Sequence, residues 1–189
     1  MKKIAIFASG SGSNAQAIAE HFNKGEIARI ACICSNSPKA FVLERARNLN
    51  IESYVFTRSD FYESDKVINY LDSKEIDFIV LAGFLWLVPS SLIKKYPNRI
   101  VNIHPALLPA YGGKGMYGMR VHEAVIANHE NESGITIHYV NENYDEGSII
   151  LQDSCVITID DTPETVAQKV HQLEYLHYPV TIEKLVKNL

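Results

Sequence analysis

The sequence has little cysteine and no hydrophobic run long enough to cross a membrane. Three cysteines in 189 residues are an odd number, which argues against a disulfide framework. A bilayer span needs roughly 20 apolar residues, and Met1-Lys2-Lys3 leads into a strand-like run without a small-residue cleavage site. We therefore expect a cytoplasmic protein that inserts into no membrane and needs no disulfide to fold.

An excess of positive charge is also absent. The chain has 18 Lys and Arg against 22 Asp and Glu, a formal net charge of -4, and no segment concentrates the basic residues. A nucleic acid partner is therefore not expected. Cys32 and Cys34 could hold a metal, but no second Cys or His pair at ligand spacing accompanies them, so the favoured interpretation is buried core thiols and no metal.

The order of strand-like and helix-like segments predicts an α/β fold. Strands are expected at 2–8, 29–35, 51–56, 77–82 and 100–104, and helices at 15–20, 41–48, 59–71, 90–95 and 121–128. This alternation implies right-handed crossovers and a Rossmann-like, mostly parallel sheet flanked by helices. Strands at 134–140 and 148–159 suggest an appended antiparallel C-terminal pair, and Thr162-Pro163 opens a long C-terminal helix. No linker or repeat divides the chain, so residues 1–189 are expected to form one domain.

A glycine-rich loop follows the first predicted strand. It reads Ser9-Gly-Ser-Gly-Ser-Asn14, and a helix-like segment comes next. Glycines allow backbone N–H groups to approach an anion, and Ser13 and Asn14 are suited to capping the helix. The loop lacks the Lys-Ser/Thr ending of a nucleoside-triphosphate site and the third glycine of a dinucleotide site. It therefore indicates either a phosphomonoester site or a plain tight turn.

The strand at 100–104 carries the strongest chemical signal. Asn102 and His104 lie two residues apart, so both side chains point to one side of the strand at its end, where α/β folds keep their chemistry. An amide donor beside an imidazole suits a reaction that develops an oxyanion and moves a proton. Asp145 is a turn residue by default, and beside His104 it would raise the imidazole pKa. His138 is expected to be structural.

Two further segments are ambiguous from the sequence alone. The apolar run 83–88 could be core or the wall of a pocket for a flat aromatic ligand. The glycine-rich span 110–119 is too irregular for a helix or a strand, and it is expected to be mobile and to form a lid.

Four motifs in this order resemble the phosphoribosylglycinamide formyltransferases, within the wider folate-dependent formyltransferase group. They are Ser9-Gly-Ser-Gly-Ser-Asn14, Ala82-Gly-Phe84, Asn102-Ile-His-Pro-Ala-Leu-Leu-Pro109 and Asp145-Glu-Gly-Ser-Ile-Ile-Leu-Gln152. The resemblance implies formyl transfer from 10-formyltetrahydrofolate to the amine of glycinamide ribonucleotide in purine synthesis, without a metal. It implies that Asn102 and protonated His104 stabilise the oxyanion, while Asp145 keeps the histidine charged and organises water for proton transfer.

The resemblance also implies which residues bind the two substrates. Gly12, Ser13 and Asn14 would bind the ribonucleotide phosphate, Glu174 would receive the glycinamide end, and His171 and Gln172 would line that site. Arg58 would approach the folate. The pterin would be held by backbone of two stretches, namely Leu85, Trp86, Leu87 and Val88, and Asn141, Glu142, Asn143, Tyr144 and Asp145. His122 and Glu123 continue the family's segment after a departure at 111–119, and no role is carried over to them.

Other functions remain open at this point. Related formyltransferases act on methionyl-tRNA or sugar nucleotides, and one relative hydrolyses the folate donor. A non-catalytic folate- or nucleotide-binding protein on the same scaffold is the alternative from a different class. The expected partners are small molecules, and the protein could be a monomer or a homodimer.

Overall fold

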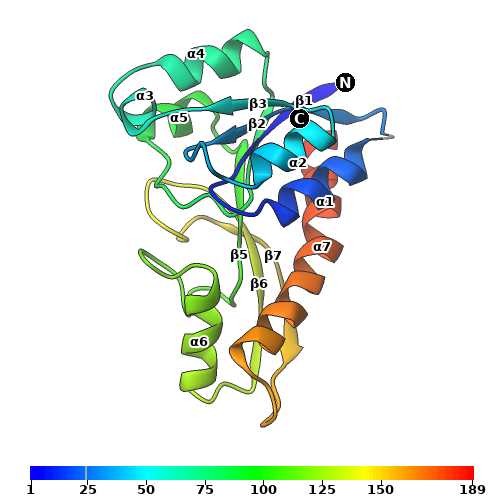
Figure 1. Cartoon of the computed structure of the whole chain (residues 1–189), viewed down its shortest axis with the longest axis vertical. Coiled ribbons are helices and arrows are strands. Elements are labelled where there is room, and N and C mark those ends of the chain that lie inside the picture. The colour runs from blue at the N-terminus through cyan, green and yellow to red at the C-terminus, as the bar shows by residue number, and fades with distance from the viewer. Residues whose placement is uncertain (24) are drawn as a thin grey trace.

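The computed structural model, which describes residues 1–23 and 25–189, is built on a seven-stranded sheet (Figure 1). In sheet order the strands are β3 (Glu52–Val55), β2 (Ala28–Ser35), β1 (Lys2–Phe7), β4 (Phe78–Leu81), β5 (Ile100–His104), β6 (Glu132–Tyr139) and β7 (Ile149–Val156). The first five are parallel, and β6 and β7 are antiparallel to their neighbours. The predicted mostly parallel sheet with an antiparallel C-terminal pair is confirmed.

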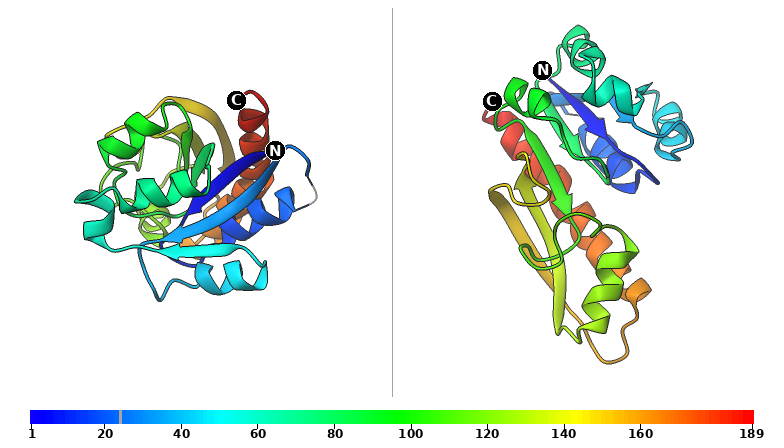
Figure 2. Two further views of the ribbon diagram at one scale, coloured as in Figure 1. Left: turned by 90° about the horizontal axis from the view of Figure 1, so that it is seen from above. Right: turned by 90° about the vertical axis from the view of Figure 1, so that its left-hand side faces the viewer.

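Helices cover both faces of the sheet (Figure 2). One hydrophobic core lies under α1 (Ser13–Phe22), α2 (Val42–Asn48), α6 (Met119–Ala127) and α7 (Pro163–Lys187). The other lies under α3 (Arg58–Tyr62), α4 (Lys66–Ser73) and α5 (Ser90–Lys95). Residues 4–7 of β1 and all of β4 are apolar, because central parallel strands are buried on both sides. Cys32 and Cys34 are buried free thiols of this core, as predicted.

The predicted single helix at 59–71 is wrong, because the chain forms two short helices there. Glu63 leaves helical geometry after α3, and the Ser64 hydroxyl donates to the Asp60 carbonyl, which offers the backbone an alternative to a continuous helix. Thr57 caps α3, with Asp60 as its reciprocal partner in a capping box, and Asp65 precedes α4.

The long C-terminal helix is confirmed, and Pro179 does not end it. Pro179 lies inside α7, which continues to Lys187. A proline in a helix interior removes one backbone hydrogen bond and costs about 3 kcal/mol. Tyr178, Ile182 and Val186 are buried against the sheet around it, and burial of side chains of this size offsets that cost.

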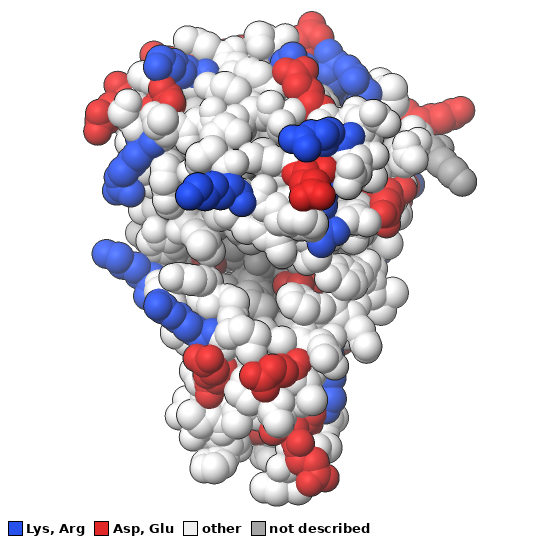
Figure 3. Space-filling model, viewed as in Figure 1, with Lys and Arg blue, Asp and Glu red and all other residues white. Residues whose placement is uncertain are grey.

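The surface agrees with the charge balance of the sequence. In Figure 3 acidic and basic side chains are interspersed on the visible face, which is hollowed at mid-height. Among the residues that the structure describes, no helix combines the length and the apolar character needed to cross a bilayer.

Candidate active site

The candidate site lies at the carboxyl end of β5, where the sheet changes from parallel to antiparallel. Asn102 and His104 lie on β5, with β4 parallel on one side and β6 antiparallel on the other. Opposite His104 on β6 is Thr136, whose hydroxyl accepts from the Leu108 N–H over 3.0 Å and donates to the Ala106 carbonyl over 2.7 Å. This side chain therefore fixes the turn that the chain makes after the strand.

Asp145 joins Asn102 and His104 from the loop between β6 and β7. Asn102 Nδ2 donates to Asp145 Oδ1 over 3.4 Å, and His104 Nδ1 lies 3.5 Å from Asp145 Oδ2. The Gly113 N–H donates to the same Oδ2 over 3.0 Å. The Asp145 side chain is only 11% exposed. The structure thus brings the three expected catalytic side chains together around one buried carboxylate.

The charge state of His104 differs from the expectation. His104 is 4% exposed, and this burial lowers its pKa below the ordinary value. The Asp145 carboxylate and the Tyr111 carbonyl favour the charged ring but do not reverse the shift. Asp145 therefore acts on the pKa of His104 in the expected direction, but the loss of hydration on burial outweighs the attraction of the carboxylate, so the net shift is downward.

Asp145 itself is stabilised as an anion. Burial acts to raise its pKa, but the contact with His138, the proximity of His104 and the Gly113 N–H together hold the pKa below the ordinary value. A carboxylate that accepts several hydrogen bonds in a buried site stays ionised at neutral pH. The cluster therefore combines a negative Asp145 with a histidine that is neutral until something in the site favours its protonation.

Sequence reasoning missed His138, which belongs to the site. It pairs with Asn102 in the β5–β6 register, and its Nε2 lies 3.2 Å from Asn102 Nδ2 and 3.6 Å from Asp145 Oδ1. Its Nδ1 lies 2.8 Å from the Tyr139 carbonyl, so Nδ1 carries a proton, and Nε2 is the nitrogen that faces the Asn102 amide and the Asp145 carboxylate. Only the antiparallel register of β5 and β6 could have identified it.

Tyr111 contributes to the site through its backbone alone. Its carbonyl lies 2.7 Å from His104 Nε2, so this nitrogen carries the proton in the neutral ring. Nδ1 of His104 is then the nitrogen that faces Asp145. No sequence signal reveals a backbone carbonyl that orients a ring, so the sequence places Tyr111 only within the glycine-rich span 110–119.

A cleft opens beside Asn102 and Asp145, which form part of its wall. It is lined by Leu81, Phe84, Trp86, Leu87, Val88, Asn102, His138, Val140, Asn143, Tyr144 and Asp145. Most residues expected at the pterin therefore share a cavity with Asn102 and Asp145. Both interpretations of the run 83–88 hold in part: Phe84 and Val88 are buried in the core, and Phe84, Trp86, Leu87 and Val88 also line the cleft.

The other expected folate residues lie around this cleft. The Arg58 guanidinium lies 5.0 Å from the centre of the Tyr62 ring and 5.8 Å from that of Trp86, so Arg58 adjoins the cleft through Trp86. Leu85 and Glu142 are exposed. Asn141 accepts from the Asn143 N–H over 3.0 Å, which shapes the loop that leads to Asp145.

The glycine loop after β1 has the backbone geometry of an anion site but not the predicted caps. Gly12 has a φ of 73° and stands at the start of α1, where no side chain caps the helix. The expectation that Ser13 or Asn14 caps the helix is wrong, because both residues are already inside it. A Cβ on Gly12 would lie 2.3 Å from Val42 Cγ2, so the loop passes α2 too closely for any side chain.

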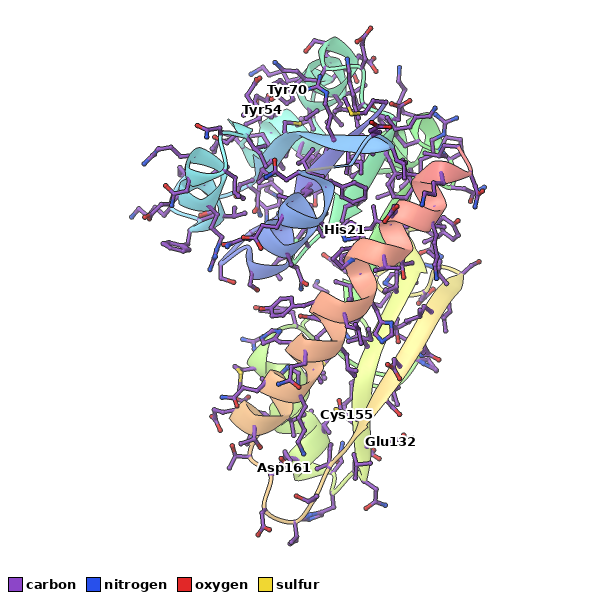
Figure 4. The ribbon with its side chains drawn as sticks, turned by 90° about the vertical axis from the view of Figure 1, so that its right-hand side faces the viewer. His21, Tyr54, Tyr70, Glu132, Cys155 and Asp161 are labelled. Carbon is purple, nitrogen blue, oxygen red and sulfur yellow. The ribbon has the colours of Figure 1, made fainter. Side chains whose placement is uncertain are left out.

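A second buried carboxylate connects α1 with α7. Glu174 is 4% exposed, and its Oε2 accepts from Asn14 Nδ2 over 2.9 Å and lies 2.7 Å from His171 Nδ1. This contact raises the pKa of His171, so that ring is readily protonated. Gln172 is exposed, and within the part of the chain that the structure describes it forms no hydrogen bond with Glu174. Figure 4 shows α7 alongside β6 and β7, rising from near Asp161.

The site contains no preformed metal cluster in the described part of the chain. Within residues 1–23 and 25–189 no group of three or more His, Cys, Asp or Glu side chains is placed to hold an ion.

The fold and the site define a member of the formyl transferase family, and the chain belongs to it: the family profile matches residues 2–182. The chain is 40% identical over 183 residues to the chloroplastic phosphoribosylglycinamide formyltransferase of Arabidopsis thaliana, covering 94% of this chain and 63% of that protein. It is 37% identical to the Bacillus subtilis phosphoribosylglycinamide formyltransferase, covering 98% and 95% of the two chains.

A solved structure agrees with these relatives. The phosphoribosylglycinamide formyltransferase of Bacillus halodurans superimposes with a TM-score of 0.87 at 39% identity, covering 98% of this chain and 95% of that one. The chain spans 63% of the length of the Arabidopsis protein and nearly all of the Bacillus subtilis protein. The family is thus established over almost the whole chain.

Proposed function

We propose that the chain transfers the formyl group of 10-formyltetrahydrofolate to the amine of N1-(5-phosphoribosyl)glycinamide. The products are formylglycinamide ribonucleotide and tetrahydrofolate, and the step belongs to de novo purine biosynthesis. The observation that carries this proposal is the convergence of Asn102, His104 and Asp145 beside one cleft, whose wall includes Asn102 and Asp145. The names of the related proteins support it. Residues 1–189 would act as one catalytic domain.

The catalytic step needs hydrogen-bond donors where negative charge develops. The donor substrate supplies an activated formyl carbon, and bonding of the acceptor's amine nitrogen to it moves charge onto the formyl oxygen. Asn102 Nδ2 and protonated His104 donate to that oxygen. Nδ1 of His104 is the nitrogen in position to do so, because Nε2 is held by the Tyr111 carbonyl.

Asp145 assists the proton transfer that accompanies the reaction. The new N–C bond releases one proton from the attacking amine, and cleavage of the C–N10 bond consumes one proton on the departing folate nitrogen. Asp145 is ionised and buried, so it stabilises the protonated form of His104 as charge develops and orients water for this transfer. Its contacts with Asn102 and His104 are long, as catalytic contacts often are before substrate binds.

Binding of the two substrates would use the two ends of the site. The cleft beside Trp86 and Tyr144 has the apolar walls and backbone groups that suit a pterin, and Arg58 suits the carboxylates of its tail. At the other end, backbone N–H groups around Gly12 and the N-terminus of α1 suit the phosphate. The acceptor's other contacts would come from Ser13, Asn14, His171, Gln172 and Glu174.

The test follows release of tetrahydrofolate with and without glycinamide ribonucleotide. We expect release that depends on the ribonucleotide, and we expect His104→Ala to lower kcat by roughly 10²- to 10⁴-fold because it removes both a donor and a proton carrier. His177→Ala is the matched control, since His177 pairs with Asp153 rather than with the site.

Two other results would contradict the proposal. Release that does not depend on the ribonucleotide would identify a hydrolase of the folate donor. Absence of turnover in the intact protein, with folate binding preserved, would favour a binding protein on this scaffold.

A further inference from the structure

His122 is a buried histidine whose role is not explained by the site described above. It lies on α6, is 2% exposed, and its Nδ1 has no hydrogen-bond partner. An unsatisfied buried polar atom carries a desolvation penalty, so such atoms are few in native proteins and each requires an explanation. An apolar side chain of similar size would fill this position without the penalty, which suggests that the ring serves a ligand.

His122 lies near Glu174, His171 and His104. α6 packs against α7, which carries Glu174 and His171. Burial lowers the pKa of His122, the nearby His171 and His104 lower it further, and Glu174 only partly opposes them. The ring is therefore neutral at neutral pH, and a neutral imidazole has one nitrogen that accepts a hydrogen bond.

A second unsatisfied atom lies at the same end of the site. Asn14 Oδ1 is buried without a partner, although Asn14 Nδ2 donates to Glu174 Oε2. The region thus presents a buried carboxylate, an unpaired amide oxygen and an unpaired imidazole nitrogen. With its Nδ1 unprotonated, His122 adds a third hydrogen-bond acceptor to the carboxylate of Glu174 and the amide oxygen of Asn14. Such a region suits a ligand that is rich in N–H donors, such as a primary amine linked to an amide.

We propose that His122 is a substrate-binding residue whose Nδ1 accepts a hydrogen bond from the glycinamide end of the acceptor, beside Glu174. This contact fixes the direction in which the amine approaches the formyl carbon. The inference rests on the proposed function and deepens it, because it assigns a further residue to recognition of the acceptor. Formation of the new N–C bond still depends on Asn102, His104 and Asp145.

The test compares variants that keep or remove an acceptor at the position of Nδ1. Asparagine places its amide oxygen near Nδ1, glutamine places its amide near Nε2, and phenylalanine removes both nitrogens at similar volume. We expect His122→Phe and His122→Gln to raise the KM for the ribonucleotide about tenfold or more, since each leaves a donor of the acceptor unpaired. His122→Asn keeps most of the affinity, and the KM for the folate donor stays unchanged in all three.

His177→Phe is the matched control, because it makes the same change on α7 at a histidine that pairs with Asp153. We expect it to leave both KM values unchanged. Circular dichroism and Tm verify that each variant is folded, and the comparison of Asn with Gln decides the question even if His122→Phe does not fold. Equal ribonucleotide KM values for these two variants, or a folded His122→Phe with unchanged ribonucleotide KM, would overturn the inference.

Calorimetric titration with glycinamide ribonucleotide alone separates this inference from the proposed function. A wild-type protein that binds the ribonucleotide but transfers no formyl group contradicts the proposed function. The inference is still supported in that case if His122→Gln weakens ribonucleotide binding while His122→Asn does not. Unchanged binding in every variant overturns the inference even where the wild type is fully active.

Discussion

Two glycine-rich segments of this chain have similar composition and different structural roles. The first segment, residues 9–14, is fixed from several sides: the Ser9 N–H donates to the Gly83 carbonyl over 3.0 Å, and the Val42 N–H donates to the Gly10 carbonyl over 3.1 Å. Arg45 Nε donates to the Ser11 carbonyl over 2.8 Å. The first segment is therefore part of the frame formed by β1, β4 and α2.

The second segment, residues 111–119, is attached differently. Gly113, Gly115 and Gly118 have positive φ values, and a Cβ on any of them would meet no atom within 4 Å. Its closest links to the rest of the site are the Tyr111 carbonyl on His104 and the Gly113 N–H on Asp145. The second segment thus contacts the proposed catalytic residues directly, through backbone atoms.

The comparison shows that glycine serves two purposes here. In the first segment it allows close packing of the backbone against α2. In the second it allows a backbone path that no bulky side chain obstructs, next to groups whose protonation matters. Substitutions in the first segment should therefore affect folding and acceptor binding, whereas changes at the second should affect the catalytic step.

The largest expected effect comes from removing the negative charge of Asp145, whose carboxylate accepts a hydrogen bond from the Gly113 N–H of the second segment. Asp145→Asn keeps the shape of the side chain, but it removes the carboxylate that favours protonated His104. We expect kcat to fall about a thousandfold and the pKa of His104, followed by NMR, to fall below its value in the wild type. An unchanged His104 pKa in the variant would show that the carboxylate does not control this ring.

The next effect tests the first segment as part of the frame. In Gly12→Ala the new Cβ would lie 2.3 Å from Val42 Cγ2, at a φ of 73°. Overpacking and backbone strain together should lower the free energy of unfolding by roughly 2–4 kcal/mol. Gly10→Ala is the control, since its Cβ would meet nothing within 4 Å. Urea unfolding of both variants provides the measurement, and equal stability of the two would refute the distinction.

A smaller effect is expected for Gly112→Ala in the second segment. Its Cβ would lie 2.6 Å from Leu108 Cδ2 and 3.4 Å from Asp145 Cβ. The end of the leucine side chain can move aside, so stability should change by about 1 kcal/mol or less. Displacement of the backbone from Asp145 should lower kcat about tenfold, since positioning is sensitive to small shifts. Steady-state kinetics and urea unfolding provide the two measurements. If the second segment belonged to the frame instead, Gly112→Ala would lose stability and keep its full kcat.

The smallest effect concerns stability and pH. His104 has a lowered pKa in the folded state, so as pH falls through the ordinary value of 6.5 the unfolded chain binds a proton that the folded chain does not. This histidine therefore destabilises the fold in acid, whereas His171, whose pKa is raised, acts in the opposite direction. We expect the loss of unfolding free energy between about pH 7.5 and pH 5.5 to be smaller in His104→Asn than in the wild type. Equal losses would argue against a buried neutral His104.

The sequence predicted those parts of the fold that depend on local pattern. Apolar β-branched runs identified the buried strands, and the two-residue spacing of Asn102 and His104 predicted that both side chains meet on one side of β5. Asp145 had no local signal beyond that of a turn residue, and its place came from the resemblance. The roles assigned to these residues stay predictions until the variants are measured.

Other features could not be predicted because they depend on contacts distant in sequence. His138 enters the site through the register of β6 against β5. The lowered pKa of His104 results from its burial by parts of the chain that are distant from β5 in sequence. The break between α3 and α4 depends on competition between hydrogen bonds of the Ser64 hydroxyl and the helix backbone. Continuation of α7 past Pro179 depends on the core packed against it.

The hydrogen bond from Asn14 to Glu174 joins two residues that are 160 positions apart in the sequence. During synthesis the loop after β1 leaves the ribosome early, while the carboxylate that completes the proposed acceptor region is on the last helix. A nascent chain that has already folded β1 to β5 would hold the loop at residues 9–14 without the buried carboxylate of Glu174. The order of synthesis thus delays the contact between Asn14 and Glu174 until α7 docks, so a partly made chain would lack a complete form of the proposed acceptor site.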